Sequence, residues 1–155
     1  MSRLFIHRRR VLQAGLAMSA LLVSPASRAC EFWTTGLRIL QPWTRATVEG
    51  DAFAVVCMKF DLVTASDRLI GVETPVASGA DMGGIGARPA VDFAIAAGVD
   101  SALDEGGTFI RLLGLRHPLE LARTYPLKLV FEKGGVVNAD LDVDYERSDP
   151  AAKAS

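Results

Sequence analysis

Apolar and polar residues alternate with a period of two along much of the chain after residue 29. The alternation is clearest at 125–133 and 136–145, two runs that are separated by the glycine pair at 134–135. Because successive side chains of a strand point to opposite faces, this pattern predicts a two-strand hairpin with one apolar face. Residues 53–60, which are rich in β-forming residues, predict a buried strand.

Two further segments are bounded by proline. Residues 37–43 alternate in the same way and predict a short strand that ends at Pro42. Residues 106–119 begin with a glycine pair, continue with apolar residues, are interrupted by Gly114 and end near Pro118. This second segment predicts a strand that follows a tight turn, because paired glycines allow positive φ.

Short β segments separated by Gly, Pro and Asp turns, with almost no helical periodicity, predict an all-β fold. The expected architecture is an antiparallel β-sandwich in a single domain at 30–147. The tail at 148–155 is polar and Ala-rich, and we expect it to be disordered.

The first 29 residues have the composition of an export signal. Arg8, Arg9 and Arg10 precede an apolar run at 16–23 that is too short to span a bilayer, and Ser27 and Ala29 are small residues before a cleavage point. The arginines resemble a twin-arginine signal, which predicts export to the periplasm and cleavage before Cys30. No later segment has the apolar length of a membrane helix.

Cleavage would remove five arginines and no acidic residue. The remaining chain has 12 Lys and Arg against 18 Asp and Glu, which is a net charge of −6. Nucleic acid is therefore excluded as an expected partner, because phosphate binding needs a clustered basic face.

Several segments resemble the periplasmic copper chaperone family written PCu(A)C. Residues 39–47 contain Pro-Trp-Thr-Arg-Ala-Thr, residues 67–71 read Asp-Arg-Leu-Ile-Gly, and residues 87–89 and 95–98 align with two further family landmarks. The glycine pair and Gly-Leu exit of residues 106–119 are similar to the family's signature strand, which carries a His-x-Met pair. The resemblance covers about residues 37–143 and implies a cupredoxin-like β-sandwich.

The resemblance also implies a copper(I) site made of two His and two Met, and most of it is missing here. Three of the four ligand positions are occupied by Ala87, Phe109 and Arg111. The glycine-rich segment at 77–86 has only Met82 as a soft donor. We therefore predict a degenerate member of the family in which a copper site of the usual type does not form.

Arg111 places a fixed cation near the expected metal position, where it would repel a metal ion. Three alternatives follow for this residue: it binds a small anion, it binds a carboxylate of a partner protein, or it forms an internal ion pair with a nearby Asp or Glu.

The two cysteines after the signal, Cys30 and Cys57, allow several readings. In an oxidising compartment they form a disulfide or stay as inert buried thiols. Cys57 is also a candidate thiolate ligand for copper(I), alongside Met82. Lipidation of Cys30 is the remaining option, although Ser27 and Arg28 match a lipoprotein cleavage box poorly.

The residues do not favour an enzyme. His117 is the one His after the signal, and the chain contains no nucleophile elbow, phosphate loop or Cys-x-x-Cys motif. Three functions remain: a copper-chaperone-related protein of copper handling or oxidase assembly with weak or unconventional copper binding, a metal-free protein-interaction module that uses the former metal surface, and a small-anion binder centred on Arg111.

Overall fold

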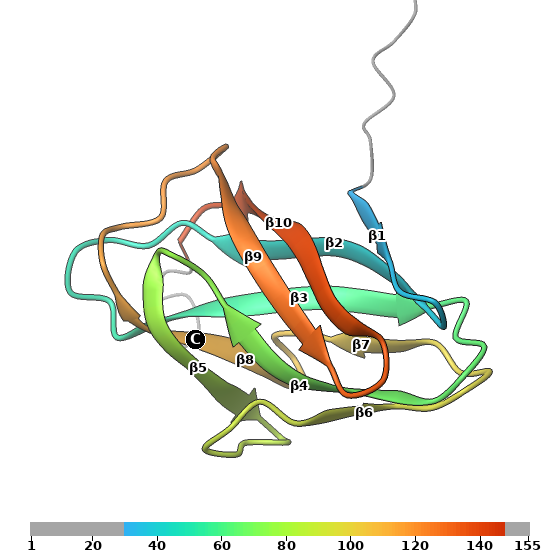
Figure 1. Cartoon of the computed structure of the whole chain (residues 1–155). Helices are drawn as coiled ribbons and strands as arrows, with labels where there is room; N and C mark the ends of the chain where they lie inside the picture. The colour runs from blue at the N-terminus through green and yellow to red at the C-terminus, as the bar shows by residue number, and fades with distance from the viewer. Residues whose placement is uncertain (1–29, 148–155) are drawn as a thin grey trace, which may run out of the picture.

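The computed structural model describes residues 30–147. The predicted signal peptide at 1–29 and the predicted tail at 148–155 lie outside the described residues and stay predictions. The described part consists of strands joined by turns and loops, without a helix (Figure 1). The strands are β1 Glu31–Trp33, β2 Arg38–Arg45, β3 Phe53–Asp61, β4 Asp67–Glu73, β5 Ala77–Gly84, β6 Phe93–Ile95, β7 Ser101–Leu103, β8 Thr108–Leu115, β9 Thr124–Phe131 and β10 Gly135–Tyr145.

The strands form one curled sheet in the order β5-β8-β3-β2-β10-β9-β4-β6, with β1 paired to β2 and β7 paired to β3. All pairs are antiparallel except β2 with β10, which is parallel. Figure 1 shows β9 and β10 in front of β3, in the manner of two layers. The predicted all-β sandwich is confirmed, and the one parallel pair makes its sheet mixed.

The two halves of the sheet face each other across one apolar core. Phe60 of β3 packs against Phe131 of β9 at 6.2 Å and against Phe93 of β6 at 5.8 Å between ring centroids. Aromatic contacts of this kind bury large apolar surfaces of both layers. The predicted hairpin is also confirmed. β9 pairs with β10, from Phe131 opposite Gly135 at the turn to Thr124 opposite Asp142. On β10, the apolar side chains of Ala139, Leu141 and Val143 are buried.

The sequence predicted that the strand at 37–43 ends at Pro42, and this prediction is wrong. β2 continues through Pro42 to Arg45 because the chain takes a positive φ of 45° at Gln41 and its register with β3 shifts between Leu40 and Trp43. Pro42 lies inside this irregularity, where its missing N–H interrupts no regular ladder.

The predicted strand after the glycine pair is confirmed as β8. Its turn is organised by Asp104, which accepts hydrogen bonds from the amides of Gly106 and Gly107 at 3.0 Å each and donates its own amide to Thr108. Positive φ occurs at Gly114 (59°) and not at the glycine pair, which corrects the reason given for that turn. A Cβ at Gly114 would lie 2.0 Å from Ser78 Oγ.

Within residues 30–147, no helix has the length and apolar composition needed to cross a membrane.

Candidate functional site

The structure brings the three positions that the sequence resemblance predicts as former copper ligands to one end of the β5–β8 pair. Phe109 and Arg111 lie in β8, directly opposite Gly83 and Asp81 of β5. Residues paired in this way share one face of a sheet. Ala87 lies in the turn after β5, where its amide donates to Gly84 O at 3.3 Å.

Arg111 forms an internal ion pair with Asp81. Its Nε donates to Oδ1 at 2.7 Å and its Nη2 to Oδ2 at 2.5 Å, which is the two-pronged geometry typical of Arg with a carboxylate. The hydrogen bond to Asp81 raises the pKa of Arg111. The guanidinium carbon also lies 5.3 Å from the ring centroid of Phe53. Of the three alternatives for Arg111, this geometry matches the internal ion pair.

Phe109 lies over the two glycines at the end of β5. A Cβ built on Gly83 would lie 2.3 Å from Phe109 Cε2, and one on Gly84 would lie 2.9 Å from Cε1. The ring therefore fills the space that side chains at these two positions would need. Glycines of an edge strand are commonly covered by a cross-strand aromatic ring in this way.

These residues do not fit a copper(I) ion of the family type. Copper(I) prefers thioether, imidazole and thiolate donors, and Ala87, Phe109 and Arg111 provide none of them. Among the described residues, no three His, Cys, Asp or Glu side chains gather closely enough to hold a metal ion.

The two candidate soft donors, Met82 and Cys57, are not brought together. Met82 pairs with Ile110, which pairs with Val56, and all three are buried in the core. Cys57 follows Val56 in β3, so its side chain points to the opposite face of the sheet. Both candidates are 1% exposed. One ion cannot bind to both of them in this arrangement, and ligation by either alone stays a prediction.

Cys57 lies beneath a polar and aromatic cluster that sequence reasoning missed. Burial, and then the charge of Glu105, raise the pKa of the Cys57 thiol to about 12. Glu105 is bonded to Arg45, with 2.6 Å from Nε to Oε1. The Arg45 guanidinium carbon lies 5.3 Å from the Tyr145 ring and 5.9 Å from the Trp43 ring. At neutral pH Cys57 is therefore a protonated thiol, and a copper(I) ion would have to displace this proton to bind.

Cys30 and Cys57 are both free thiols in the structure. Cys30 is half-buried, and its Sγ donates to Asp142 Oδ2 at 3.4 Å. Burial and this hydrogen bond raise the pKa of Cys30. The inert-thiol reading of Cys57 matches its surroundings.

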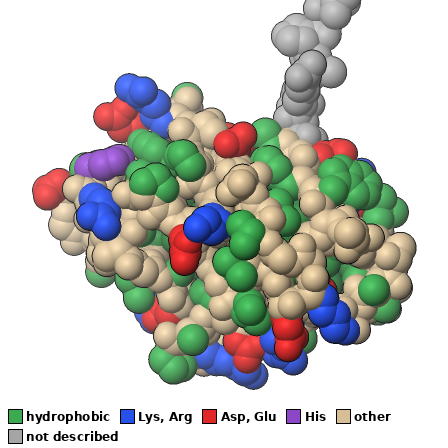
Figure 2. Space-filling view, in the orientation of Figure 1, with side chains coloured by type: hydrophobic (Ala, Val, Ile, Leu, Met, Phe, Trp, Pro, Cys, Tyr) green, Lys and Arg blue, Asp and Glu red, His purple; other side chains and the backbone are tan. Residues whose placement is uncertain are grey.

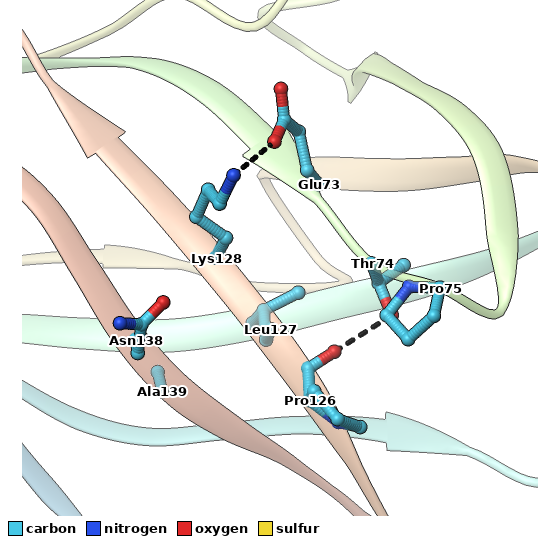
Figure 3. A pocket seen from close by; sticks show the side chains of 8 residues that line it. All are labelled: Glu73, Thr74, Pro75, Pro126, Leu127, Lys128, Asn138 and Ala139. Carbon is cyan, nitrogen blue, oxygen red and sulfur yellow. Dashed lines mark hydrogen bonds and ion pairs between the residues drawn. The ribbon is translucent and has the colours of Figure 1, made fainter.

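A separate cavity of about 380 Å³ opens where β4 ends beside β9 and β10 (Figure 3). Its two charged side chains, Glu73 and Lys128, are bonded to each other at 2.9 Å. The hydroxyl of Thr74 donates to Pro126 O at 2.8 Å. The lining contains no His, Cys or Met, so this cavity provides no soft metal donor.

Opposite charges lie next to one another on the surface shown in Figure 2, without a large patch of either sign. The sequence left the partner of Arg111 open, because Asp81 is selected by the register of β5 against β8, which no local pattern specifies. The cluster around Arg45 had no local signal either, because its members are distant in the sequence: Trp43 and Tyr145, whose rings are in contact, are 102 positions apart.

Comparison of the chain with known proteins identifies the family to which it belongs. The model of the LpqE-like family, described as "Putative lipoprotein LpqE-like", matches residues 37–143. No curated protein matches the chain.

Solved structures of copper chaperone domains have the same fold. The chain is similar to a copper-bound PCuAC domain from PmoF2, with 24% identity, a TM-score of 0.67, and 74% of this chain and 97% of that one covered. It is similar to an apo PCuAC domain from PmoF1, with 25% identity, a TM-score of 0.66, and 74% and 98% covered. It also resembles the copper(I) form of DR1885 from Deinococcus radiodurans, with 20% identity, a TM-score of 0.59, and 67% and 75% covered. The predicted cupredoxin-like fold and the predicted relationship to PCuAC domains are confirmed, and the chain belongs to the LpqE-like family.

Proposed function

We propose that this protein is an exported, non-enzymatic relative of the PCuAC copper chaperones that acts in periplasmic copper handling or cuproenzyme assembly without the family's His/Met copper(I) site. It works as a metal-independent interaction module, and the former metal surface around Ala87, Phe109 and Arg111 is its contact surface. Its partner is a periplasmic protein, either a cuproenzyme or another copper chaperone.

The observation that carries this proposal is the ion pair between Arg111 and Asp81 at a former ligand position. The guanidinium offers hydrogen-bond donors only and no electron pair to a metal ion, and its pairing with the carboxylate fixes the shape of the surface. Aromatic and Arg side chains held rigidly in this way are the residue types most enriched at the energetic centres of protein interfaces.

The two other hypotheses have less support. A small anion would have to compete with Asp81 for Nε and Nη2 of Arg111. Copper(I) binding by Met82 and Cys57 together would require donors on opposite faces of one sheet. Neither the anion-binding hypothesis nor the copper-binding hypothesis gives a role to Phe109, whose ring lies over Gly83 and Gly84.

Copper titration tests the metal-independent part of the proposal. The processed, reduced protein is titrated with copper(I) in the presence of a competing chelator, beside Met82→Leu and Cys57→Ser variants. We expect the chelator to take all the copper in each case. If the wild type retained one equivalent of copper(I) and either variant lost it, the metal-independent part of the proposal would be overturned.

Complementation tests the biological part. In a deletion strain, copper-oxidase activity should be restored by the wild type and by Cys57→Ser, but not by a Phe109→Asp variant that is folded and exported. Full activity with Phe109→Asp would remove the contact surface from the proposal, and an unaffected deletion strain would remove the role in cuproenzyme assembly.

Export and anchoring are tested by fractionation. Replacement of Arg8 and Arg9 by Lys should retain the protein in the cytoplasm, as expected for the twin-arginine route. The family's description as lipoproteins makes Cys30 the residue to examine. Incorporation of labelled fatty acid that is lost in Cys30→Ser would establish an anchor, and no incorporation would leave the processed protein unattached.

A further inference from the structure

The Pro-Trp-Thr-Arg-Ala-Thr segment at the end of β2 has no part in the proposed contact surface, yet it is bonded to both ends of β8. β8 is the strand that carries Phe109 and Arg111. Arg45 binds the turn that precedes this strand, and Thr47 binds the segment that follows it. One short segment of the chain therefore holds the strand of the contact surface at its two ends.

Before β8, Arg45 is bonded to Glu105, the residue directly preceding the glycine pair. Nε donates to Oε1 at 2.6 Å and Nη2 donates to Oε2 at 3.0 Å, so both carboxylate oxygens accept a hydrogen bond. The guanidinium carbon lies 5.3 Å from the ring centroid of Tyr145, and Nη1 donates to Glu146 O at 3.3 Å. The ring and the carbonyl fix the orientation in which the guanidinium meets Glu105.

After β8, Thr47 is bonded to Leu119 in both directions. The Thr47 amide donates to Leu119 O at 3.0 Å, and the Leu119 amide donates to Thr47 Oγ1 at 2.8 Å. Leu119 is fully buried in the core. The chain that leaves β8 is therefore fixed to the end of β2 by a side chain as well as by the backbone.

The turn that Arg45 holds is packed against the contact surface. Gly107 O in this turn accepts a hydrogen bond from the amide of Ile85 at 3.1 Å. A Cβ on Gly84 would lie 1.9 Å from Gly107 O and 2.9 Å from Phe109 Cε1, so the turn, the end of β5 and the ring leave no free space between them. A displacement of the turn would therefore move the backbone on which the Phe109 ring rests, because closely packed groups transmit strain.

We propose that Arg45 is a positioning residue of the contact surface: through Glu105 it fixes the turn before β8 and, with the turn, the place of the Phe109 ring. Because Thr47 already fixes the far end of β8, the bond between Arg45 and Glu105 determines where the near end lies. Lys could not replace Arg45, since one ammonium group does not bind two carboxylate oxygens in this parallel geometry. This inference rests on the proposed function for its biological meaning, whereas the placement of the ring is measured on the purified protein alone.

β2 contains a matched control for this ion pair. Arg38 forms the same two-pronged bond with Asp61, with distances of 2.7 and 2.6 Å. Its side chain is 24% exposed, against 34% for Arg45. Asp61 is the last residue of β3 and does not belong to the turn before β8. Loss of either pair removes one half-buried ion pair, but only the loss of Arg45 should move Phe109.

Fluorine NMR of the processed protein labelled with para-fluorophenylalanine tests the placement. The resonance of Phe109 is assigned from its loss in Phe109→Leu. Arg45→Met, which keeps an unbranched side chain and loses the guanidinium, should shift this resonance, and Arg38→Met should leave it unchanged. Amide exchange gives a second readout. The amides of Ile85 and Gly107 should exchange at least about tenfold faster in Arg45→Met than in Arg38→Met, while the amides of β9 exchange alike in the two variants.

A Phe109 resonance that Arg45→Met leaves unchanged would overturn the proposal, and so would an equal shift in Arg38→Met. Glu105→Gln provides a second variant, which removes the charge of the partner and should shift the same resonance; it replaces Arg45→Met if that variant does not fold. These measurements need no partner protein. Their failure leaves the complementation result with Phe109→Asp unaffected, so the two proposals are tested separately.

Discussion

The guanidinium of Arg111 is held by the carboxylate of Asp81, the residue directly opposite it in the neighbouring strand, through hydrogen bonds of 2.7 and 2.5 Å. Asp81 is nearly buried, at 8% exposure. Two residues in register across a β pair therefore neutralise each other at a position where the sequence resemblance predicts a lost metal ligand. The chemistry of the surface changes while the strand pairing stays intact.

A double-mutant cycle should measure this pair. Asp81→Ala and Arg111→Ala should each lower the free energy of unfolding, because each leaves a partly buried charge without its partner. The double variant should lose less than the sum of the two single losses. Urea unfolding of the four proteins gives the values, and strict additivity would show that the pair contributes no interaction.

Gly83→Ala should destabilise the fold by about 1–3 kcal/mol, since the new Cβ would lie 2.3 Å from the ring of Phe109. Gly79→Ala in the same strand is the control. A Cβ there meets nothing within 4 Å, so stability should be unchanged or rise by up to about 1 kcal/mol. Chemical denaturation compares the two, and adding Phe109→Ala should relieve the loss at Gly83. Equal effects of the two alanines would mean that the ring does not rest on Gly83.

Copper(I) binding should be gained when the missing donors are supplied. The triple variant Ala87→Met, Phe109→His, Arg111→Met places three soft donors at one end of the β5–β8 pair and removes the cation. Asp81, left without Arg111, adds a favourable negative charge. We expect copper(I) to bind at least tenfold more tightly than to the wild type in a chelator competition. A triple Leu variant is the control, and equal binding by both would contradict the assignment of these positions.

Stability should fall in alkaline solution because of Cys57. The thiol ionises near its ordinary pKa of 9.0 in the unfolded chain but only near 12 in the folded protein. The unfolded state therefore releases a proton first as the pH rises above 9, and the stability contribution is lost progressively between pH 9 and 12. Between pH 8 and pH 10 the expected loss is about 1.4 kcal/mol.

Urea unfolding at the two pH values, compared with Cys57→Ala, isolates this effect. The variant is less stable at both values, because it leaves a cavity, but should show a smaller decrease between them. An equal decrease in the two proteins would contradict the expected pKa shift. The contributions of Lys, Tyr and Cys30 are common to both and cancel in the comparison.

Strand positions were predictable because burial on one face imposes a period of two. This signal located β3, β8, β9 and β10, and the resemblance to PCu(A)C proteins supplied the cupredoxin-like arrangement. It failed at Pro42, where the usual rule that proline ends a strand was overridden by an irregular register around Gln41. The glycine-rich segment at 77–86 carried no strand prediction, yet its first eight residues form β5, whose glycines make room for Phe109.

Sequence alone determined which side chains this protein has at the former ligand positions: Ala87, Phe109 and Arg111 offer no soft donor in any conformation. Only the tertiary structure decided what these residues do instead. The register of β5 against β8 selects Asp81 as the partner of Arg111, and the same register places Gly83 under Phe109. Cross-strand neighbours depend on pairing between distant segments, and no local pattern specifies that pairing.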